Sequence, residues 1–144
     1  MRVFVYRNLH NQVWSVVALE GQHKGRVVIH APYVQLSGGI KFNVRETGRQ
    51  RVIREKRKNV HAGIQGDLLM VADGVFRYDN VCVSNATGIP IDYDAYDSMT
   101  EVTYNPYKYS TFVEKATEAP VTKLDKGFVV LHGNRVFMAD FTDL

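Results

Sequence analysis

The chain contains one cysteine, four prolines and no long hydrophobic run among its 144 residues. Cys82 alone cannot form an internal disulfide, and its place between two valines predicts a buried, reduced thiol. No apolar segment approaches the roughly 18 residues that a membrane span requires. Residues 1–7 are typical of a short strand rather than a signal peptide, because no small-residue cleavage site follows them. We therefore expect one domain over residues 1–144 in a reducing cytoplasm.

Recognisable catalytic and metal-binding motifs are also missing from the sequence. The five histidines and one cysteine form no cluster of the zinc-binding type. Asp92, Asp94 and Asp97 begin like a calcium loop, but the glycine and closing glutamate of that loop are absent at the required spacing. Neither a nucleophile elbow nor a glycine-rich phosphate loop is present. The sequence thus predicts no catalytic residues, no metal and no cofactor, although an acid–base site built from distant residues stays open.

Positive charge, in contrast, is concentrated in one segment. Residues 45–58 contain seven Arg or Lys and two Glu, a net +5, whereas the whole chain is +3 and the remainder therefore −2. Like charges this close on an ordered element repel one another. Such a density indicates an anionic ligand, and phosphate is the usual anion for arginine forks.

The same segment carries the signals of a helix over residues 47–59. Thr47 and Gln50 form a capping-box pattern at its start. Val52 and Ile53 define a narrow apolar face, and the opposite face carries a basic stripe. The basic stripe consists of Arg51, Arg54, Arg57 and Lys58. We interpret it as a candidate phosphate-binding surface; the alternative interpretation is a solvated helix face without a ligand.

Most of the remaining chain predicts β-strands rich in valine, isoleucine and aromatic residues. An edge strand or a bend is expected at Pro32, and a turn at residues 37–39. Gly133 and Asn134 predict the turn of a C-terminal β-hairpin. The expected fold class is α+β, a small antiparallel sheet with one principal basic helix and this hairpin. The expected strands cover residues 2–9, 12–20, 26–36, 40–45, 60–71, 128–131 and 135–141.

Aromatic residues gather in the second half of the chain. Six of the eight tyrosines fall between residues 78 and 109. Their rings would suit the stacking of nucleotide bases, and they would equally suit a core or a subunit interface. Both interpretations stay open for Tyr93, Tyr96, Tyr104, Tyr107, Tyr109 and Phe112.

Two segments resemble a set of small phage-encoded proteins. They are residues 48–62, GRQRVIREKRKNVHA, and residues 102–108, VTYNPYK, supported by VYRNL at 5–9 and VWS at 13–15. The set is similar to the first-described type of Thoeris anti-defence protein, the signal-sequestering sponges. The resemblance covers most of the chain.

This resemblance implies a protein that binds cyclic ADP-ribose isomers without degrading them, in the cytoplasm of a host bacterium. Some members of the family also bind cyclic di- or trinucleotides. The family assembles as dimers that group into hexamers, with arginine on the pyrophosphate, an aromatic ring against adenine and an asparagine in each pocket. Residues of matching type in this chain, besides the basic stripe, are Asn59, Tyr104, Asn105, Tyr107 and Lys108.

Two other functions remain possible from the sequence. The basic helix at 47–59 would also lie well along a nucleic-acid backbone, although the net acidic remainder disfavours a broad electrostatic footprint. An enzyme acting on a nucleotide, or a module that inhibits a protein, is the third alternative.

Overall fold

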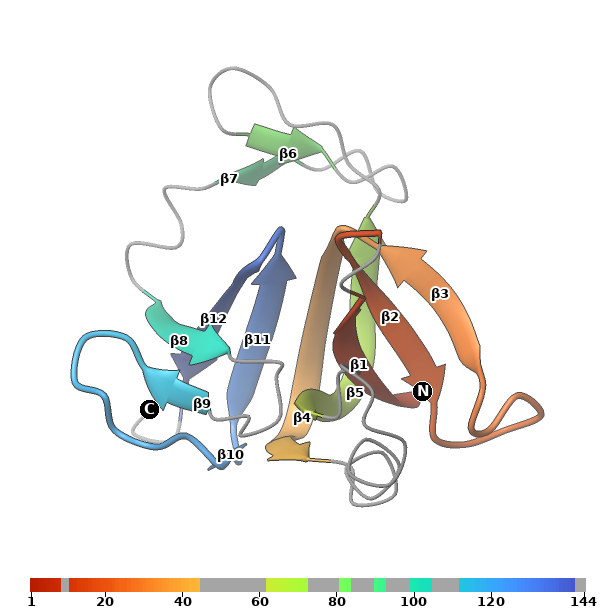
Figure 1. The fold of residues 1–144 in the computed structure, drawn as a ribbon, viewed down its shortest axis with the longest axis horizontal. Coiled ribbons are helices and arrows are strands. Elements are labelled where there is room, and N and C mark those ends of the chain that lie inside the picture. Colours follow the sequence, from red (N-terminus) through yellow and green to blue (C-terminus); the bar gives the residue numbers. More distant parts are fainter. Residues whose placement is uncertain are drawn as a thin grey trace, which may run out of the picture.

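The computed structural model of the protein describes residues 1–8, 11–44, 62–72, 81–83, 90–92, 99–104 and 112–141. Every regular element within these ranges is a β-strand, so the expectation of an α+β fold is wrong for the described part of the chain (Figure 1). The basic helix predicted at 47–59 lies outside the described residues. The strands are β1 (Arg2–Asn8), β2 (Val13–Ala18), β3 (Val27–Ala31), β4 (Tyr33–Val44), β5 (Ala62–Ala72), β6 (Val81–Val83), β7 (Pro90–Asp92), β8 (Thr100–Tyr104), β9 (Phe112–Glu114), β10 (Lys123–Leu124), β11 (Gly127–His132) and β12 (Arg135–Asp140).

Ten of these strands form one antiparallel sheet. Its order is β3-β2-β1-β5-β4-β11-β12-β8-β9, and β10 pairs with β4 beside this path. Strands β6 and β7 pair only with each other, and Cys82 lies opposite Ile91 there. The β11–β12 hairpin turns at Gly133 and Asn134, which confirms the predicted C-terminal hairpin.

A proline separates two strands that the sequence predicted as one. Strand β3 ends at Ala31 and β4 begins at Tyr33, because Pro32 has no N–H to continue a ladder. The expected bend at Pro32 is therefore confirmed, and β3 is an edge strand of the sheet. The carbonyl of Pro32 instead accepts a hydrogen bond from the N–H of Gly133, 3.1 Å away.

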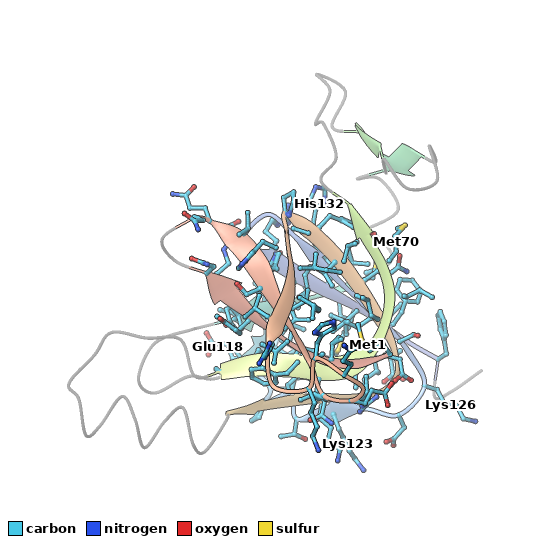
Figure 2. The ribbon with its side chains drawn as sticks, turned by 90° about the vertical axis from the view of Figure 1, so that its right-hand side faces the viewer. Met1, Met70, Glu118, Lys123, Lys126 and His132 are labelled. Carbon is cyan, nitrogen blue, oxygen red and sulfur yellow. The ribbon has the colours of Figure 1, made fainter. Side chains whose placement is uncertain are left out.

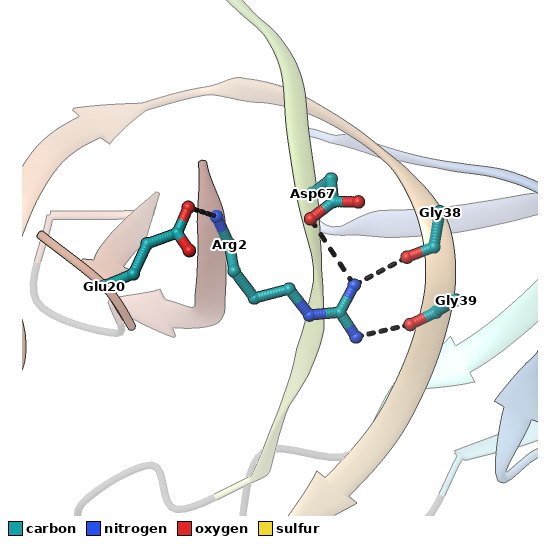
Figure 3. Close-up of polar contacts among 5 residues, drawn as sticks. All are labelled: Arg2, Glu20, Gly38, Gly39 and Asp67. Carbon is teal, nitrogen blue, oxygen red and sulfur yellow. Dashed lines mark hydrogen bonds and ion pairs between the residues drawn. The ribbon is translucent and has the colours of Figure 1, made fainter.

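The turn predicted at residues 37–39 is a bulge inside β4. The pairing of β4 with β5 shifts register between Ser37 and Lys41, where Gly38 and Gly39 adopt φ values of 64° and 60°. Arg2 holds this bulge: its guanidinium donates to the carbonyls of both glycines, and its Nη1 lies 3.6 Å from Asp67 Oδ1 (Figure 3). The two glycines do interrupt the regular pairing, as the sequence indicated. They do not end the strand, because β4 pairs with β5 both before and after the bulge.

The sheet curls around a main apolar core, and a second, smaller apolar cluster contains Tyr33, Val130 and Phe137. Figure 1 shows β8, β11 and β12 across from β1, β2 and β3, and Figure 2 shows side chains filling the space between them. Trp14 of β2 and Tyr104 of β8 meet with ring centroids 5.5 Å apart, and Phe42 meets Phe112 at 5.3 Å. Fully burying one such large side chain contributes roughly 1.5–3 kcal/mol. The largest members with no exposed surface are Trp14, Leu36, Ile64 and Leu131.

Candidate functional site

The residues that the sequence proposed for ligand binding fall mostly outside the described ranges. Tyr104, at the end of β8, is the member whose position the structure describes. The other eight lie outside the described residues. They are Arg51, Arg54, Arg57, Lys58, Asn59, Asn105, Tyr107 and Lys108.

Tyr104 joins three strands through its hydroxyl group. The hydroxyl donates to the carbonyl of Ala62 in β5 at 2.6 Å and accepts from the backbone N–H of Arg7 in β1 at 3.2 Å. Its ring packs against Trp14 and Phe112. Burial raises the pKa of Tyr104 well above its usual value, so the hydroxyl remains protonated and can donate. These contacts give Tyr104 a role in the core, the alternative that the sequence had left open for this ring.

Arg7 lies beside Tyr104, at the end of β1. Its Nη1 donates to the carbonyl of Gly133 in the hairpin turn at 2.6 Å. Its Cζ lies 5.2 Å from the centre of the Trp14 ring, within the range of a cation–π contact. Burial lowers the pKa of the Arg7 guanidinium, but arginine starts so high that the group keeps its charge.

The partners of Arg7 differ from those of Arg2 and Arg135. Arg2 lies beside the carboxylate of Asp67. Arg135 forms a bidentate ion pair with Glu101, with N–O distances of 2.8 and 3.2 Å. Arg7 is half-buried and has a neutral carbonyl and a ring as partners; no carboxylate within 4 Å belongs to the described residues. Its positive charge is consequently left without a counter-charge in the described part of the chain.

Trp14 adds a buried hydrogen-bond donor for which the described residues offer no acceptor. The residue has no exposed surface, and its Nε1–H finds no hydrogen-bond acceptor in the described part of the chain. Such a group is uncommon in a native core, where buried donors are nearly always paired. Together, Arg7, Trp14, Tyr104 and Gly133 define what we call the Arg7 cluster.

The other polar contacts among the described residues form no catalytic constellation. Ser15 Oγ lies 3.0 Å from His30 Nδ1, but Ser15 has no exposed surface and cannot meet a substrate. Burial, followed by the charge of Arg135, lowers the pKa of His132 to about 4, so this imidazole is neutral near pH 7. No group of three potential metal ligands occurs among the described residues.

The sequence analysis assigned no role to Arg7 or Trp14, although a signal was present. Val3 and Val5 point into the core, and Arg7 continues their alternation. A cation that follows two buried valines on the inward face of a strand is unusual. The register then places Trp14 directly opposite Arg7, and this pairing could not be read before the strands were aligned.

The chain belongs to a family of bacteriophage proteins. The family whose profile matches residues 1–139 is described as the Mycobacterium phage L5 gene 82 protein. The gene 82 protein of Mycobacterium phage L5 itself is 38% identical over 141 residues, which cover 94% of each chain. No solved structure matches the chain.

These comparisons confirm that the chain resembles phage proteins and give no support to the further link with Thoeris inhibition, which stays a prediction. Among the residues that the structure describes, no helix has the length and hydropathy of a membrane span.

Proposed function

We propose that the protein is a non-catalytic phage protein that binds and sequesters a cyclic nucleotide signal. The observation that carries this proposal is the concentration of positive charge at residues 45–58, net +5 in a chain of +3. The candidate ligands are cyclic ADP-ribose isomers and, as a second class, cyclic di- and trinucleotides. Membership of a phage family is consistent with an anti-defence role.

Binding without turnover suits the composition of the chain. A protein that depletes a scarce signal requires a dissociation constant of about nanomolar order, roughly −12 kcal/mol. Arginine forks on a pyrophosphate, with an aromatic ring against the base, supply interactions of this kind. We further propose a homo-oligomer, a dimer or a trimer of dimers, in which two subunits enclose each ligand and so reduce the entropic cost of binding.

The test is a binding and release experiment. The purified protein is incubated with cyclic ADP-ribose isomers, separated from free ligand and heat-denatured. We expect intact ligand to be recovered in the supernatant. Failure to bind the isomers and the cyclic oligonucleotides, or recovery of a chemically altered ligand, would contradict sequestration.

Two matched variants test whether the cations at residues 45–58 hold the ligand. The double substitution Arg54→Gln/Arg57→Gln should abolish retention. Lys24→Gln/Lys126→Gln removes the same amount of charge from two exposed positions and should leave retention unchanged. Equal loss in both variants would indicate that general charge, rather than the segment at 45–58, holds the ligand.

The same charge density also favours a second candidate, binding to a nucleic-acid backbone. Seven cations within fourteen residues would contact several phosphates. Log affinity for DNA or RNA should then fall linearly with log salt, with a slope of about −0.9 per phosphate contacted in duplex DNA. A nucleic acid bound no more tightly than small phosphates would exclude this function.

A further inference from the structure

We propose that the Arg7 cluster is a binding site for a small oxyanion of the phosphate class. The site lies where β1 meets the turn of the β11–β12 hairpin. It uses none of the cations at residues 45–58, so it goes beyond the function proposed above and can be tested independently of that function.

The first argument concerns charge. A guanidinium that is half-buried loses hydration, and a carbonyl oxygen with a ring face compensates for only part of that loss. Two described carboxylates pair with arginines, but neither pairs with Arg7: Asp67 pairs with Arg2, and Glu101 pairs with Arg135. An anion beside Arg7 would supply the missing counter-charge.

The second argument concerns hydrogen-bond donors. A guanidinium has five N–H groups in a planar fork, and Nη1 of Arg7 makes the side-chain hydrogen bond that the structure describes. The remaining N–H groups have no acceptor among the described residues. A tetrahedral oxyanion offers several acceptor oxygens at the spacing of such a fork, which a single water or carbonyl does not.

The third argument is that the cluster is fixed before any ligand arrives. The backbone of Arg7 donates to the Tyr104 hydroxyl, which is itself bonded to Ala62. Trp14 is the register partner of Arg7 and forms the wall under its guanidinium. Gly133 is held in turn by its bond to the carbonyl of Pro32. A ligand would therefore bind with little ordering of the protein.

The chain provides its own probe of this site. Trp14 is its only tryptophan, so tryptophan fluorescence reports directly on the surroundings of Arg7. The full-length protein is titrated with inorganic phosphate, and a reference sample receives sodium chloride at equal ionic strength. We expect a saturable change of emission with phosphate and none with chloride. Identical responses to the two salts would overturn the proposal.

A second titration with adenosine monophosphate identifies the source of the anion. Saturation at lower concentration than with inorganic phosphate would indicate the phosphate group of a nucleotide. Saturation at equal or higher concentration would indicate free phosphate. Either result supports the site, and the absence of saturation with both ligands excludes it.

Variants separate a binding role from a structural one. Arg7→Lys keeps the charge but loses the fork, and we expect roughly tenfold weaker phosphate binding. Lys126→Gln, an exposed cation elsewhere, should bind as the native chain does. Arg54→Gln/Arg57→Gln should also retain the phosphate response, even if it loses the nucleotide signal. Native-like affinity in Arg7→Lys would mean that Arg7 only links β1 to the hairpin.

Phosphorus NMR and thermal denaturation of Arg54→Gln/Arg57→Gln provide a test that needs no change at Arg7 and that lacks two cations of the other proposed phosphate site. Bound phosphate should broaden or shift its resonance and raise the melting temperature above that of the chloride reference. If Arg7→Lys does not fold, these two measurements decide the question. Phosphate that changes neither quantity overturns the proposal.

Discussion

The hydroxyl of Tyr104 donates a hydrogen bond to the backbone carbonyl of Ala62, 2.6 Å away and 42 positions earlier in the chain. The two residues belong to β8 and β5, which are not neighbours in the sheet. Their bond therefore acts across the interior and holds the curl of the sheet. The same hydroxyl accepts from Arg7, so one atom satisfies groups on two strands.

Replacing Tyr104 by phenylalanine should lower the free energy of unfolding by about 2–3 kcal/mol. The carbonyl of Ala62 and the N–H of Arg7 would both lose a buried partner, at roughly 1–3 kcal/mol for each unsatisfied group in the general case. Urea denaturation followed by circular dichroism measures this change. Tyr6→Phe is the control, because no described hydrogen bond uses its hydroxyl, and we expect less than about 0.5 kcal/mol. Equal effects in the two variants would contradict the bridging role.

Alanine at Gly38 should be more harmful than alanine at Gly39. Both residues have positive φ values, 64° and 60°, so each substitution should lower the free energy of unfolding by about 1–2 kcal/mol. A Cβ at Gly38 would also lie 2.5 Å from Oδ2 of Asp67, whereas one at Gly39 would meet no atom within 4 Å. Displacing that carboxylate from Arg2 should add about 0.5–1 kcal/mol.

A double-mutant cycle isolates this extra term. In an Asp67→Ala background the difference between the two alanine variants should disappear, because no carboxylate is left to displace. A difference that persists would place the strain of Gly38 in the backbone instead of at the Arg2–Asp67 pair. Thermal denaturation at low ionic strength is the appropriate measurement.

Acid should destabilise the fold through His132 before the carboxylates titrate. Burial lowers the pKa of His132 from 6.5 to about 4, so between these values the unfolded chain binds a proton that the native chain does not. Stability is therefore complete above pH 6.5 and falls as the pH is lowered toward 4, by at most about 1.4 kcal/mol per pH unit. Denaturation midpoints measured between pH 5 and 7 should show this slope. In His132→Gln the slope should be absent, and a slope that remains would assign the effect to another group.

Neutralising Glu101 should have a modest effect that depends on salt. Its carboxylate accepts from Arg135 at 2.8 Å and lies 3.3 Å from Lys115 Nζ, and these partners lower its pKa. Because the pair lies near the surface, Glu101→Gln should lower the free energy of unfolding by only about 0.5–1 kcal/mol. The loss should shrink in 1 M salt, where charges are screened. An effect independent of salt would indicate lost packing rather than lost charge.

The first strands and the C-terminal hairpin could be predicted from the sequence because their signals are local, whereas the strands from β6 to β10 were not predicted. Valines and aromatic residues alternate in β1, β2 is rich in valine, and Gly133 with Asn134 marks the hairpin turn. The bend at Pro32 followed from the same signals, but the expected strand ends at 36 and 40 were wrong, because β4 continues through the glycines as a bulge. The fold class was wrong because a helical pattern at 47–59 was taken as the principal element, whereas the described core consists of β-strands alone.

The Arg7 cluster could not be assembled from the sequence for a different reason. Arg7, Trp14, Tyr104 and Gly133 belong to four separated segments, and their meeting depends on how the sheet curls. No spacing in the sequence encodes that curl. Tyr104 was selected for its ring, but its hydroxyl bonds and its packing on Trp14 and Phe112 became visible only with the register of β8.

The bond between Arg7 and Gly133 joins positions 126 residues apart. Contacts of such large sequence separation are reached late in folding, because the loop they close carries a high entropic cost. During synthesis on the ribosome, the apolar faces of the first strands therefore remain partly exposed to water until the last hairpin has left the exit tunnel and can pack against them. We expect the full-length chain to refold slowly for its size, and its early strands to require protection from aggregation while translation is still under way.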